Sequence, residues 1–331
     1  MIIVKTPYRI SFFGGGTDYP NWFSHFGGGV ISATINKHIY LSIRNRPGFF
    51  QKKNRIIYSK TEEVNNFSEI RLNPIKQIFL KERIRNGLEF HYDGELPARS
   101  GIGSSSAFVV GLAQIISLAK KQKFNKKSIA KKAIYYERKV LKESVGVQDQ
   151  IACAYGGLNY IKIKKDGNFE VKNIFKNTFK EKKLSDKLIL VYTGLQKINH
   201  SHIKKYVKDL KKKKKTLLET MKLTDVAYDL IIKNQYNDFG RLLNETWKLK
   251  KETSSFISNY KIDKIYEEAL NNGAVGGKLL GAGGGGFLLF YVNKDKKNFL
   301  KKKLKNFLVF DVCFENSGTK LIYMDKNEKF V

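Results

Sequence analysis

The chain has 331 residues, 42% of them hydrophobic, which is long and apolar enough for two domains with buried cores. Its net charge is +32, but most of its 62 basic residues are lysines, whereas proteins that read nucleic acids favour arginine, so we expect no nucleic-acid partner. The longest apolar run is too short to span a membrane, no signal peptide is recognisable, and the two cysteines form no disulfide framework, so a cytoplasmic protein is expected.

Strand and helix patterns alternate in the first half of the chain. The expected elements are a strand at 2–13 interrupted by Pro7, a strand at 30–43, short strands over 56–95 around a helix near 74–85, helices at about 107–119, 127–142 and 147–155, and a hairpin of 158–163 and 169–174. The hairpin is expected to turn at Asp166-Gly167.

The second half is richer in long helical patterns and opens with a buried strand at 187–193. The other elements expected are helices at about 200–222, 224–234, 237–251 and 262–272, a glycine loop that feeds a strand within 276–292, a Lys-rich helix at 295–306 and a closing strand at 307–314. The lysine run at 211–215 is interpreted as a solvated helix face. A polar connector at 180–186 sets the expected boundary between two domains, residues 1–184 and 185–331.

Residues 96–106 (Leu-Pro-Ala-Arg-Ser-Gly-Ile-Gly-Ser-Ser-Ser) are typical of a phosphate-binding loop. Two glycines allow sharp turns and close approach to a ligand, and the free N–H groups at the start of the following helix favour an anion. No Lys precedes the serines as in a Walker loop, and Ser106 stands where a dinucleotide fingerprint has its third glycine. A capped core helix after a glycine turn is the alternative.

Asp149 lies in an otherwise uncharged patch, residues 145–155, at the expected start of a helix. A partly buried carboxylate beside a phosphate site could accept a proton from a substrate hydroxyl or orient that hydroxyl. Glu137, on the preceding helix, could supply an oxygen ligand to Mg²⁺. The alternative for Asp149 is a helix cap without chemistry.

Three glycines followed by Thr17 and Asp18 form a loop after the first strand. This loop could lie against a polyol, with Asp18 accepting hydrogen bonds from sugar hydroxyls; a strand-ending turn with a capping Asp is the alternative. Arg9, on the strand that leads to the loop, is either a surface cation or a group that neutralises charge near a transferring phosphoryl group.

The segment Gly281-Ala-Gly-Gly-Gly-Gly286 matches the G-x-G-x-x-G pattern literally. A dinucleotide site requires a strand before the glycines, a helix after them and an acidic residue about 20 positions further on, whereas here a helix is expected before and a strand after. We therefore interpret this segment as a backbone turn that lies close to the other domain.

Three of these segments, in this order, resemble the motifs of the GHMP family of small-molecule kinases. They are residues 6–19, 96–107 and 277–287, so the resemblance extends from near the start of the chain to its last quarter. The resemblance implies an ATP-dependent kinase with an α+β fold of two domains. The N-terminal domain would be like ribosomal protein S5 domain 2, the C-terminal domain would be ferredoxin-like, and the active site would lie between them.

Within the family, residues 14–19 (Gly-Gly-Gly-Thr-Asp-Tyr), 146–150 and 154–157 are similar to the D-glycero-D-manno-heptose 7-phosphate kinases. This resemblance implies phosphorylation of the anomeric C1 hydroxyl of heptose 7-phosphate, giving heptose 1,7-bisphosphate for GDP-heptose and bacterial surface glycans such as capsule, lipopolysaccharide or S-layer glycan. Fucokinases share a Gly-Gly-x-Thr-Asp loop, so a free-sugar 1-kinase is the alternative. Outside the enzymes, the alternative is a basic RNA-binding protein on an S5-like fold.

The family pattern implies a role for each matched position. Asp149 is the catalytic carboxylate, and Arg9 takes the place of an active-site Lys or Arg. The nucleotide phosphates are expected at Arg99, Ser100, Gly101, Ile102, Gly103, Ser104, Ser105 and Ser106, with Mg²⁺ on Ser105 and Glu137. The sugar is expected at Gly15, Gly16, Thr17, Asp18, Gly283 and Gly284. In the family, the interval between these two acidic residues can be one residue shorter than the interval from Glu137 to Asp149.

A substrate with a 7-phosphate requires an additional cationic contact. The candidates are Arg44, Arg46, Arg99, Lys197, His200 and His202, and the sequence does not choose among them. The expected ligands are thus ATP, Mg²⁺ and a small sugar phosphate, with no nucleic acid and no membrane, and a homodimer is left open.

Overall fold

The computed structural model describes residues 1–331 except 176, 196–206, 208, 326–329 and 331. Its larger sheet has the strand order β12-β1-β2-β5-β3-β4, with β6 and β7 attached to another part of β2. Strand β2 (Gly28–Asn45) is long enough for both neighbours, because residues 39–45 pair with β5 (Leu88–Gly94) and residues 28–33 pair with β6 (Leu158–Ile163). The other strands of this sheet are β1 (Ile2–Phe13), β3 (Asn54–Ile57), β4 (Thr61–Val64), β7 (Phe169–Asn173) and β12 (Lys320–Met324).

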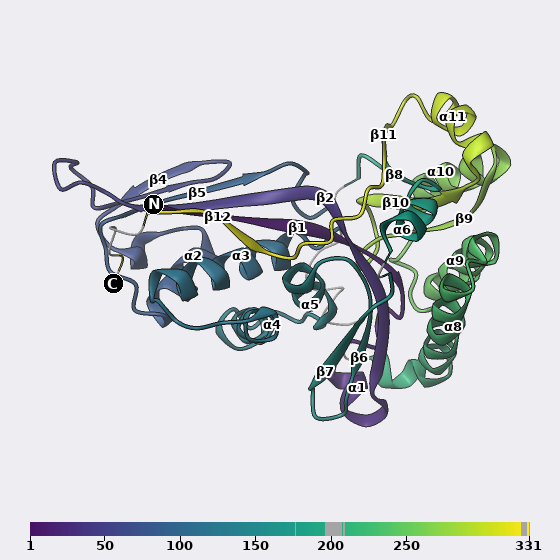
Figure 1. Cartoon of the computed structure of the whole chain (residues 1–331), viewed down its shortest axis with the longest axis horizontal. Helices are drawn as coiled ribbons and strands as arrows, with labels where there is room; N and C mark the ends of the chain where they lie inside the picture. The colour runs from purple at the N-terminus through teal and green to yellow at the C-terminus, as the bar shows by residue number, and fades with distance from the viewer. Residues whose placement is uncertain (176, 196–206, 208, 326–329, 331) are drawn as a thin grey trace.

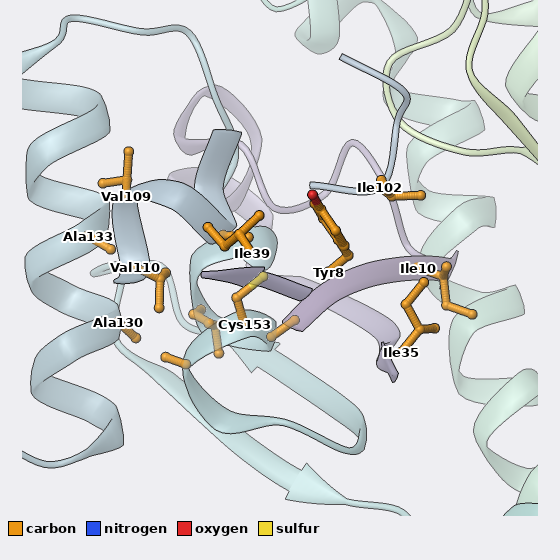
Figure 2. Close-up of a cluster of buried hydrophobic side chains, with 14 of the residues drawn as sticks. Tyr8, Ile10, Ile35, Ile39, Ile102, Val109, Val110, Ala130, Ala133 and Cys153 are labelled. Carbon is orange, nitrogen blue, oxygen red and sulfur yellow. The ribbon is translucent and has the colours of Figure 1, made fainter. Parts of the chain in front are cut away.

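Helices from the first half of the chain cover one face of the larger sheet (Figure 1). Helix α3 (Ser104–Ala119) lies directly on β1 and β2, and it is buried almost all round because its residues are apolar on every side. Figure 2 shows Val109 and Val110 of α3 beside Ala130 and Ala133 of α4 in this core. The remaining helical elements of this half are α1 (Pro20–Phe26), η1 (Phe67–Glu69), α2 (Asn73–Lys81), α4 (Lys126–Tyr135), η2 (Tyr136–Val140) and α5 (Gln148–Tyr155).

The smaller sheet, in the order β11-β8-β10-β9, is antiparallel throughout. Its strands and helices follow the chain as β-α-β-β-α-β, which is the ferredoxin-like arrangement. The strands are β8 (Leu188–Tyr192), β9 (Ala274–Leu279), β10 (Phe287–Val292) and β11 (Leu308–Asp311). The helical elements are α6 (Thr178–Ser185), which precedes β8, then η3 (Asp209–Lys213), α8 (Lys214–Ile232), α9 (Tyr236–Glu252), α10 (Tyr260–Asn271) and α11 (Lys294–Lys303).

The two sheets with their helices form the two-domain α+β fold that the motifs imply. The chain passes between them at α6, and the boundary between residues 184 and 185 stays a prediction. Strand β12, which follows the smaller sheet in sequence, pairs with residues 2–5 of β1 in the larger sheet. The last part of the chain therefore crosses back to the first part.

Several local features differ from the sequence-based prediction. Strand β9 precedes the glycine loop, so the loop joins two antiparallel strands instead of following a helix directly. Strand β12 is absent from the prediction, and α8 runs unbroken where two helices are predicted to meet near residue 223. The helix predicted at 127–142 changes at Tyr136 into the π-helical turn η2, which ends at Val140.

Helices α1 and α6 and the short η1 are absent from the prediction, whereas most other elements lie close to their predicted ranges, including the hairpin of β6 and β7. Residues 200–206 and 208 of the helix predicted at about 200–222 lie outside the described residues. Over the part of the chain that the structure describes, no helix combines the length and the apolar character needed to span a membrane.

Candidate active site

A cavity of about 760 Å³ lies between the two halves of the fold. Its walls are formed by β1, the loop after β1, and the starts of α3 and α5 on one side, and by α8, α9 and β9 on the other. The predicted site residues that line it are Arg9, Gly15, Gly16, Asp18, Arg99, Gly101, Gly103, Ser104, Ser105, Ser106, Glu137 and Asp149. Segments far apart in the sequence therefore bring their polar side chains to one cavity.

The loop before α3 is held against β1 through its backbone. The Arg9 N–H donates to the Ile102 carbonyl at 3.0 Å, and the Ile102 side chain is fully buried. Gly103 precedes α3 in the left-handed conformation (φ 73°), and it offers no side chain to cap the helix. Because the first-turn N–H groups of residues 104–106 have no intrahelical partner, the helix start presents donors and a positive dipole end to the cavity.

Glu137 of η2 faces this helix start. Its carboxyl group is fully buried and accepts a hydrogen bond from Ser106 Oγ at 3.0 Å, while Ser105 Oγ lies 3.5 Å from Oε1. The Gln150 side-chain amide also donates to Glu137. Burial raises the pKa of Glu137 to about 8, and the negative charge of Glu143 adds to this rise. A cation bound here would favour the ionised carboxylate and offset the cost of its burial.

Arg9 and Asp149 form a bidentate ion pair on the cavity wall. Arg9 Nε donates to Oδ1 at 2.7 Å, and one terminal nitrogen donates to Oδ2 at 2.6 Å. The other terminal nitrogen donates to the Gly101 carbonyl at 2.8 Å, which ties the pair to the loop before α3. Arg9 is only 4% exposed, so it is not a surface cation. Asp149 lies in the first turn of α5 after the cap residue Val147, so it is not the helix cap either.

Asp18 is almost fully buried in the loop after β1. Its carboxylate accepts hydrogen bonds from the Gly16 N–H at 3.2 Å and the Gln148 N–H at 3.3 Å. Burial raises the pKa of Asp18 to about 6, and the nearby charge of Asp149 adds to the rise. Gly146 packs so closely that a Cβ there would lie 1.8 Å from Asp18 Oδ2. A glycine at position 146 is therefore required for the carboxylate to stay in this position.

Five predicted site residues do not line the cavity but lie behind its wall. Thr17 is fully buried and holds the loop after β1, since its hydroxyl donates to the Gly14 carbonyl at 2.8 Å. Gly284 N–H donates to the Ile257 carbonyl at 3.0 Å and so fastens the third glycine loop. The full set is Thr17, Ser100, Ile102, Gly283 and Gly284.

The third glycine loop packs against the loop before α3, as the sequence interpretation expects of a turn close to the other domain. Gly281 is in the left-handed conformation (φ 72°), and a Cβ on it would lie 2.7 Å from Gly101 Cα. In addition, the Phe287 N–H donates to the Ser100 carbonyl at 3.0 Å. The two loops therefore fix the positions of the two domains at the cavity.

The candidates for a second phosphate contact lie in different places. Arg99 is exposed and lines the cavity. Arg44 and Arg46 instead form ion pairs with Glu89 at 3.0 and 3.3 Å, away from the cavity lining. The other three candidates, Lys197, His200 and His202, lie outside the described residues.

Three cationic residues that line the cavity, Lys142, Lys250 and Lys278, were not singled out from the sequence. Lys278 of β9 lines the cavity and is 6% exposed, and Lys250 of α9 donates to the carbonyls of Leu279 and Gly281 at 3.0 and 2.7 Å. Lys278 lies inside the third motif, where the glycines dominate the pattern. A lysine between glycines and buried leucines in a strand is the signal that could have identified it.

Two family models match this chain. The model of the GHMP kinases N terminal domain matches residues 73–157, and the model of the GHMP kinases C terminal domain matches residues 227–309. Together the two matches span just over half of the chain.

Individual relatives include sugar kinases. A D-glycero-alpha-D-manno-heptose 7-phosphate kinase from Campylobacter jejuni is 28% identical over 346 residues, covering 96% of this chain and 98% of the relative. A bifunctional fucokinase/GDP-fucose pyrophosphorylase from Arabidopsis thaliana is 26% identical over 95% of this chain, which spans 32% of that protein. The crystal structure of a D-glycero-D-manno-heptose 1-phosphate kinase from Bacteroides thetaiotaomicron has a TM-score of 0.79 at 22% identity, covering 98% of this chain and 100% of the other, and this likeness shows the fold.

Proposed function

Because the chain belongs to the GHMP kinase family of ATP-dependent phosphotransferases with alcohol acceptors, we propose that its acceptor is the anomeric hydroxyl of D-glycero-D-manno-heptose 7-phosphate. The product would be heptose 1,7-bisphosphate, which leads to GDP-heptose for a bacterial surface glycan. The observation that carries this proposal is the end-to-end match to the heptose 7-phosphate kinase of Campylobacter jejuni. The cavity supports it, since a buried carboxylate for sugar hydroxyls and a helix start for phosphates line the same space.

The start of α3 is the proposed site of the ATP phosphates. The N–H groups of residues 104–106 and the positive helix end would bind the phosphate oxygens, and Gly101 and Gly103 allow the backbone to approach them closely. Arg99 would extend this site with a side-chain cation, because it is exposed at the same loop and lines the cavity.

The oxygen donors at this helix start fit Mg²⁺. Within the described residues, no cluster of three or more His, Cys, Asp or Glu side chains could hold a metal by itself. Mg²⁺ does not need one, since it is commonly bound by one or two protein oxygens together with substrate phosphates and water. We propose that Ser105 and Glu137 hold the ion, with Gln150 orienting Glu137. When bound, the ion would neutralise charge on the phosphates.

Asp149 is the proposed contact of the acceptor hydroxyl. It would take a hydrogen bond or a proton from the C1 hydroxyl as that oxygen attacks phosphorus. Arg9 would hold Asp149 in position through its two hydrogen bonds and neutralise charge on the transferring group. Asp18 would accept a hydrogen bond from another sugar hydroxyl, which orients the ring.

A coupled ADP-release assay with purified protein tests the proposal. The sugars compared are heptose 7-phosphate, free heptose, fucose and galactose, each over a range of concentrations, and ³¹P NMR identifies the position of the new phosphate. We expect the highest kcat/KM with heptose 7-phosphate and a new signal from an anomeric phosphate. A higher kcat/KM with any free sugar would contradict the proposed acceptor and leave the kinase assignment intact.

A fucokinase-like or other free-sugar 1-kinase is the second candidate. The match to the fucokinase from Arabidopsis thaliana over 95% of this chain favours it as the alternative. The same assay separates the two candidates, because a free-sugar kinase would gain nothing from a phosphate at C7. The kinase family membership argues against the RNA-binding alternative.

A further inference from the structure

Lys278 is a buried cation at the junction of the two sheets. It lies on β9 opposite Leu289 of β10, and because opposite residues share a face, its side chain points with Leu289 toward the core that the larger sheet shares. Its ammonium group donates to the Phe12 carbonyl of β1 at 2.6 Å. It also lines the cavity. Lys278 therefore reaches from one domain to the other at the cavity wall.

The surroundings of Lys278 do not compensate its charge. A buried ammonium group is costly unless it is paired with an anion, and among the described residues its partner is a neutral carbonyl instead of a carboxylate. Burial lowers the pKa of Lys278 to about 7, and the positive charge of Arg9 adds to this effect. An apolar side chain would fill this position at lower cost, so the position favours an anion that comes from outside the protein.

Arg9 adds little uncompensated positive charge to this part of the cavity, because it is paired with Asp149. Three of its N–H donors are taken by Asp149 and the Gly101 carbonyl. Lys278 makes one hydrogen bond to the described residues, so two of its three N–H donors are open to a ligand. Lys278 also lies three residues before Gly281, which packs on Gly101 of the proposed phosphate loop. The charge of Arg9 also acts on Lys278, and Arg9 contacts the Gly101 carbonyl, so this ammonium group lies on the side of the cavity where phosphates are proposed to bind.

We propose that Lys278 is a further catalytic residue, which binds the phosphoryl group during its transfer to the sugar. The inference rests on the proposed position of transfer between the start of α3 and Asp149. Phosphoryl transfer spreads negative charge over three equatorial oxygens, and donors placed in advance at these oxygens lower the barrier. The role also explains why the third motif carries a lysine among its glycines.

The test is Lys278→Met, which removes the ammonium group and keeps a side chain of similar length. We expect kcat to fall about 100-fold, as for the loss of one preorganised donor. The affinity for ADP, Mg²⁺ and aluminium fluoride in the presence of sugar, a mimic of the transition state, is expected to fall by a similar factor. The affinity for AMP-PNP and Mg²⁺, a mimic of the ground state, is expected to change by less than about threefold.

Lys297→Met is the matched control. Lys297 on α11 is also buried and also donates to a backbone carbonyl, that of Asp186, but it is paired with the Asp311 carboxylate at 2.9 Å and does not line this cavity. We expect this variant to lose thermal stability while the ratio of its two affinities stays that of the wild type. Any sugar that the wild-type enzyme phosphorylates is suitable, so the failure of heptose 7-phosphate as a substrate would leave this test intact.

Unchanged kcat in Lys278→Met, or equal losses of the two affinities, would overturn the proposal and leave Lys278 as a structural link between the domains. If Lys278→Met does not fold, crystals of the wild-type enzyme with the same transition-state mimic decide the question. A distance of about 3 Å from Lys278 Nζ to a fluoride would support the proposal, because it is a hydrogen-bond distance. A separation of more than about 5 Å would reject it.

Discussion

Asp149 and Arg9 share two hydrogen bonds, so a variant that removes one partner leaves the other charge alone. Asp149→Asn is the more specific change, since the amide keeps the shape of the side chain and one hydrogen-bond acceptor. Asp149→Ala would also lower the free energy of unfolding by about 3–5 kcal/mol, because it leaves a buried guanidinium group unpaired. We expect kcat of Asp149→Asn to fall about 1,000-fold because the amide cannot accept the hydroxyl proton. Coupled ADP release measures kcat, and calorimetry with AMP-PNP should show nearly unchanged affinity.

Full turnover of Asp149→Asn would remove Asp149 from the mechanism. Loss of AMP-PNP binding would instead indicate that the pair with Arg9 serves mainly to hold the Gly101 loop.

We expect Asp18 to give the activity a pH dependence. Its pKa is raised by burial and by Asp149 to about 6, so it is ionised above pH 6 and becomes protonated as the pH falls through that value. A protonated carboxyl group loses acceptor capacity for sugar hydroxyls, so we expect kcat/KM for the sugar to fall below about pH 6 with a slope of one. The measurement is a pH profile of kcat/KM for the wild type and for Asp18→Asn. If kcat/KM of Asp18→Asn still falls below about pH 6 as in the wild type, the protonation of Asp18 is not the cause of that fall.

At the residue scale, the sequence predicts the residues that lie in or beside glycine turns. Asp18, Ser105 and Gly103 belong to such turns, and each lines the cavity. The contact of Arg9 with Asp149 was not predictable in the same way, because the two residues are 140 positions apart in the sequence. A sequence motif does not tell how far apart two such segments lie in space. Lys278 was missed because its burial depends on the packing of two sheets.

The packing of the two glycine loops is the central feature at the scale of elements, and Gly101→Ala tests it. Gly101 has φ 87°, and a Cβ on it would lie 2.6 Å from the Leu280 carbonyl oxygen. We expect the free energy of unfolding to fall by about 1–3 kcal/mol from backbone strain, and the KM for ATP to rise because the loop before α3 must move.

Gly48→Ala is the control for this change. A Cβ on Gly48 would have no neighbour within 4 Å, and its φ is not positive, so we expect the stability of this variant to stay within about 0.5 kcal/mol of wild type. Urea denaturation measures both variants. Equal stability of Gly101→Ala and Gly48→Ala would show that the contact between the loops contributes little.

The elements missed from the sequence have identifiable physical causes. Strand β9 contains Gly276 and Gly277, which weaken strand propensity, yet a Cβ on Gly276 would lie 2.1 Å from the Gly240 carbonyl oxygen of α9. The glycines therefore allow the helix and the strand to pack closely. The strand propensity of single residues does not reveal such a contact. Strand β12 is mostly exposed, so it lacks the alternation that marks a half-buried strand. The long apolar helix α3 and the hairpin of β6 and β7 carry strong local signals and were predicted.

At the scale of the whole molecule, the return of the chain to the larger sheet is expected to stabilise the first domain. Strand β12 pairs with β1, and just before it Thr319 binds the side chains of Thr6 and Gln114 at 2.8 and 2.6 Å. A chain that ends at residue 315 loses these bonds and leaves buried polar groups unpaired. We expect the free energy of unfolding to fall by about 3 kcal/mol or more. Urea denaturation measures this loss.

Tyr323→Thr is the control for the truncation, because Tyr323 lies on β12 with about half of its surface exposed. We expect this variant to differ from wild type by less than about 0.5 kcal/mol. A truncated chain as stable as Tyr323→Thr would show that the first domain does not depend on β12.

We propose that phosphoryl transfer takes place in the cavity between the start of α3 and Asp149. A crystal structure of the wild-type protein with AMP-PNP, Mg²⁺ and heptose 7-phosphate tests it most directly. We predict the terminal phosphate at the N–H groups of residues 104–106, and the C1 hydroxyl oxygen at a hydrogen-bond distance of about 3 Å from the Asp149 carboxylate. A triphosphate bound elsewhere, or a C1 hydroxyl turned away from Asp149, would show that transfer does not take place at this position.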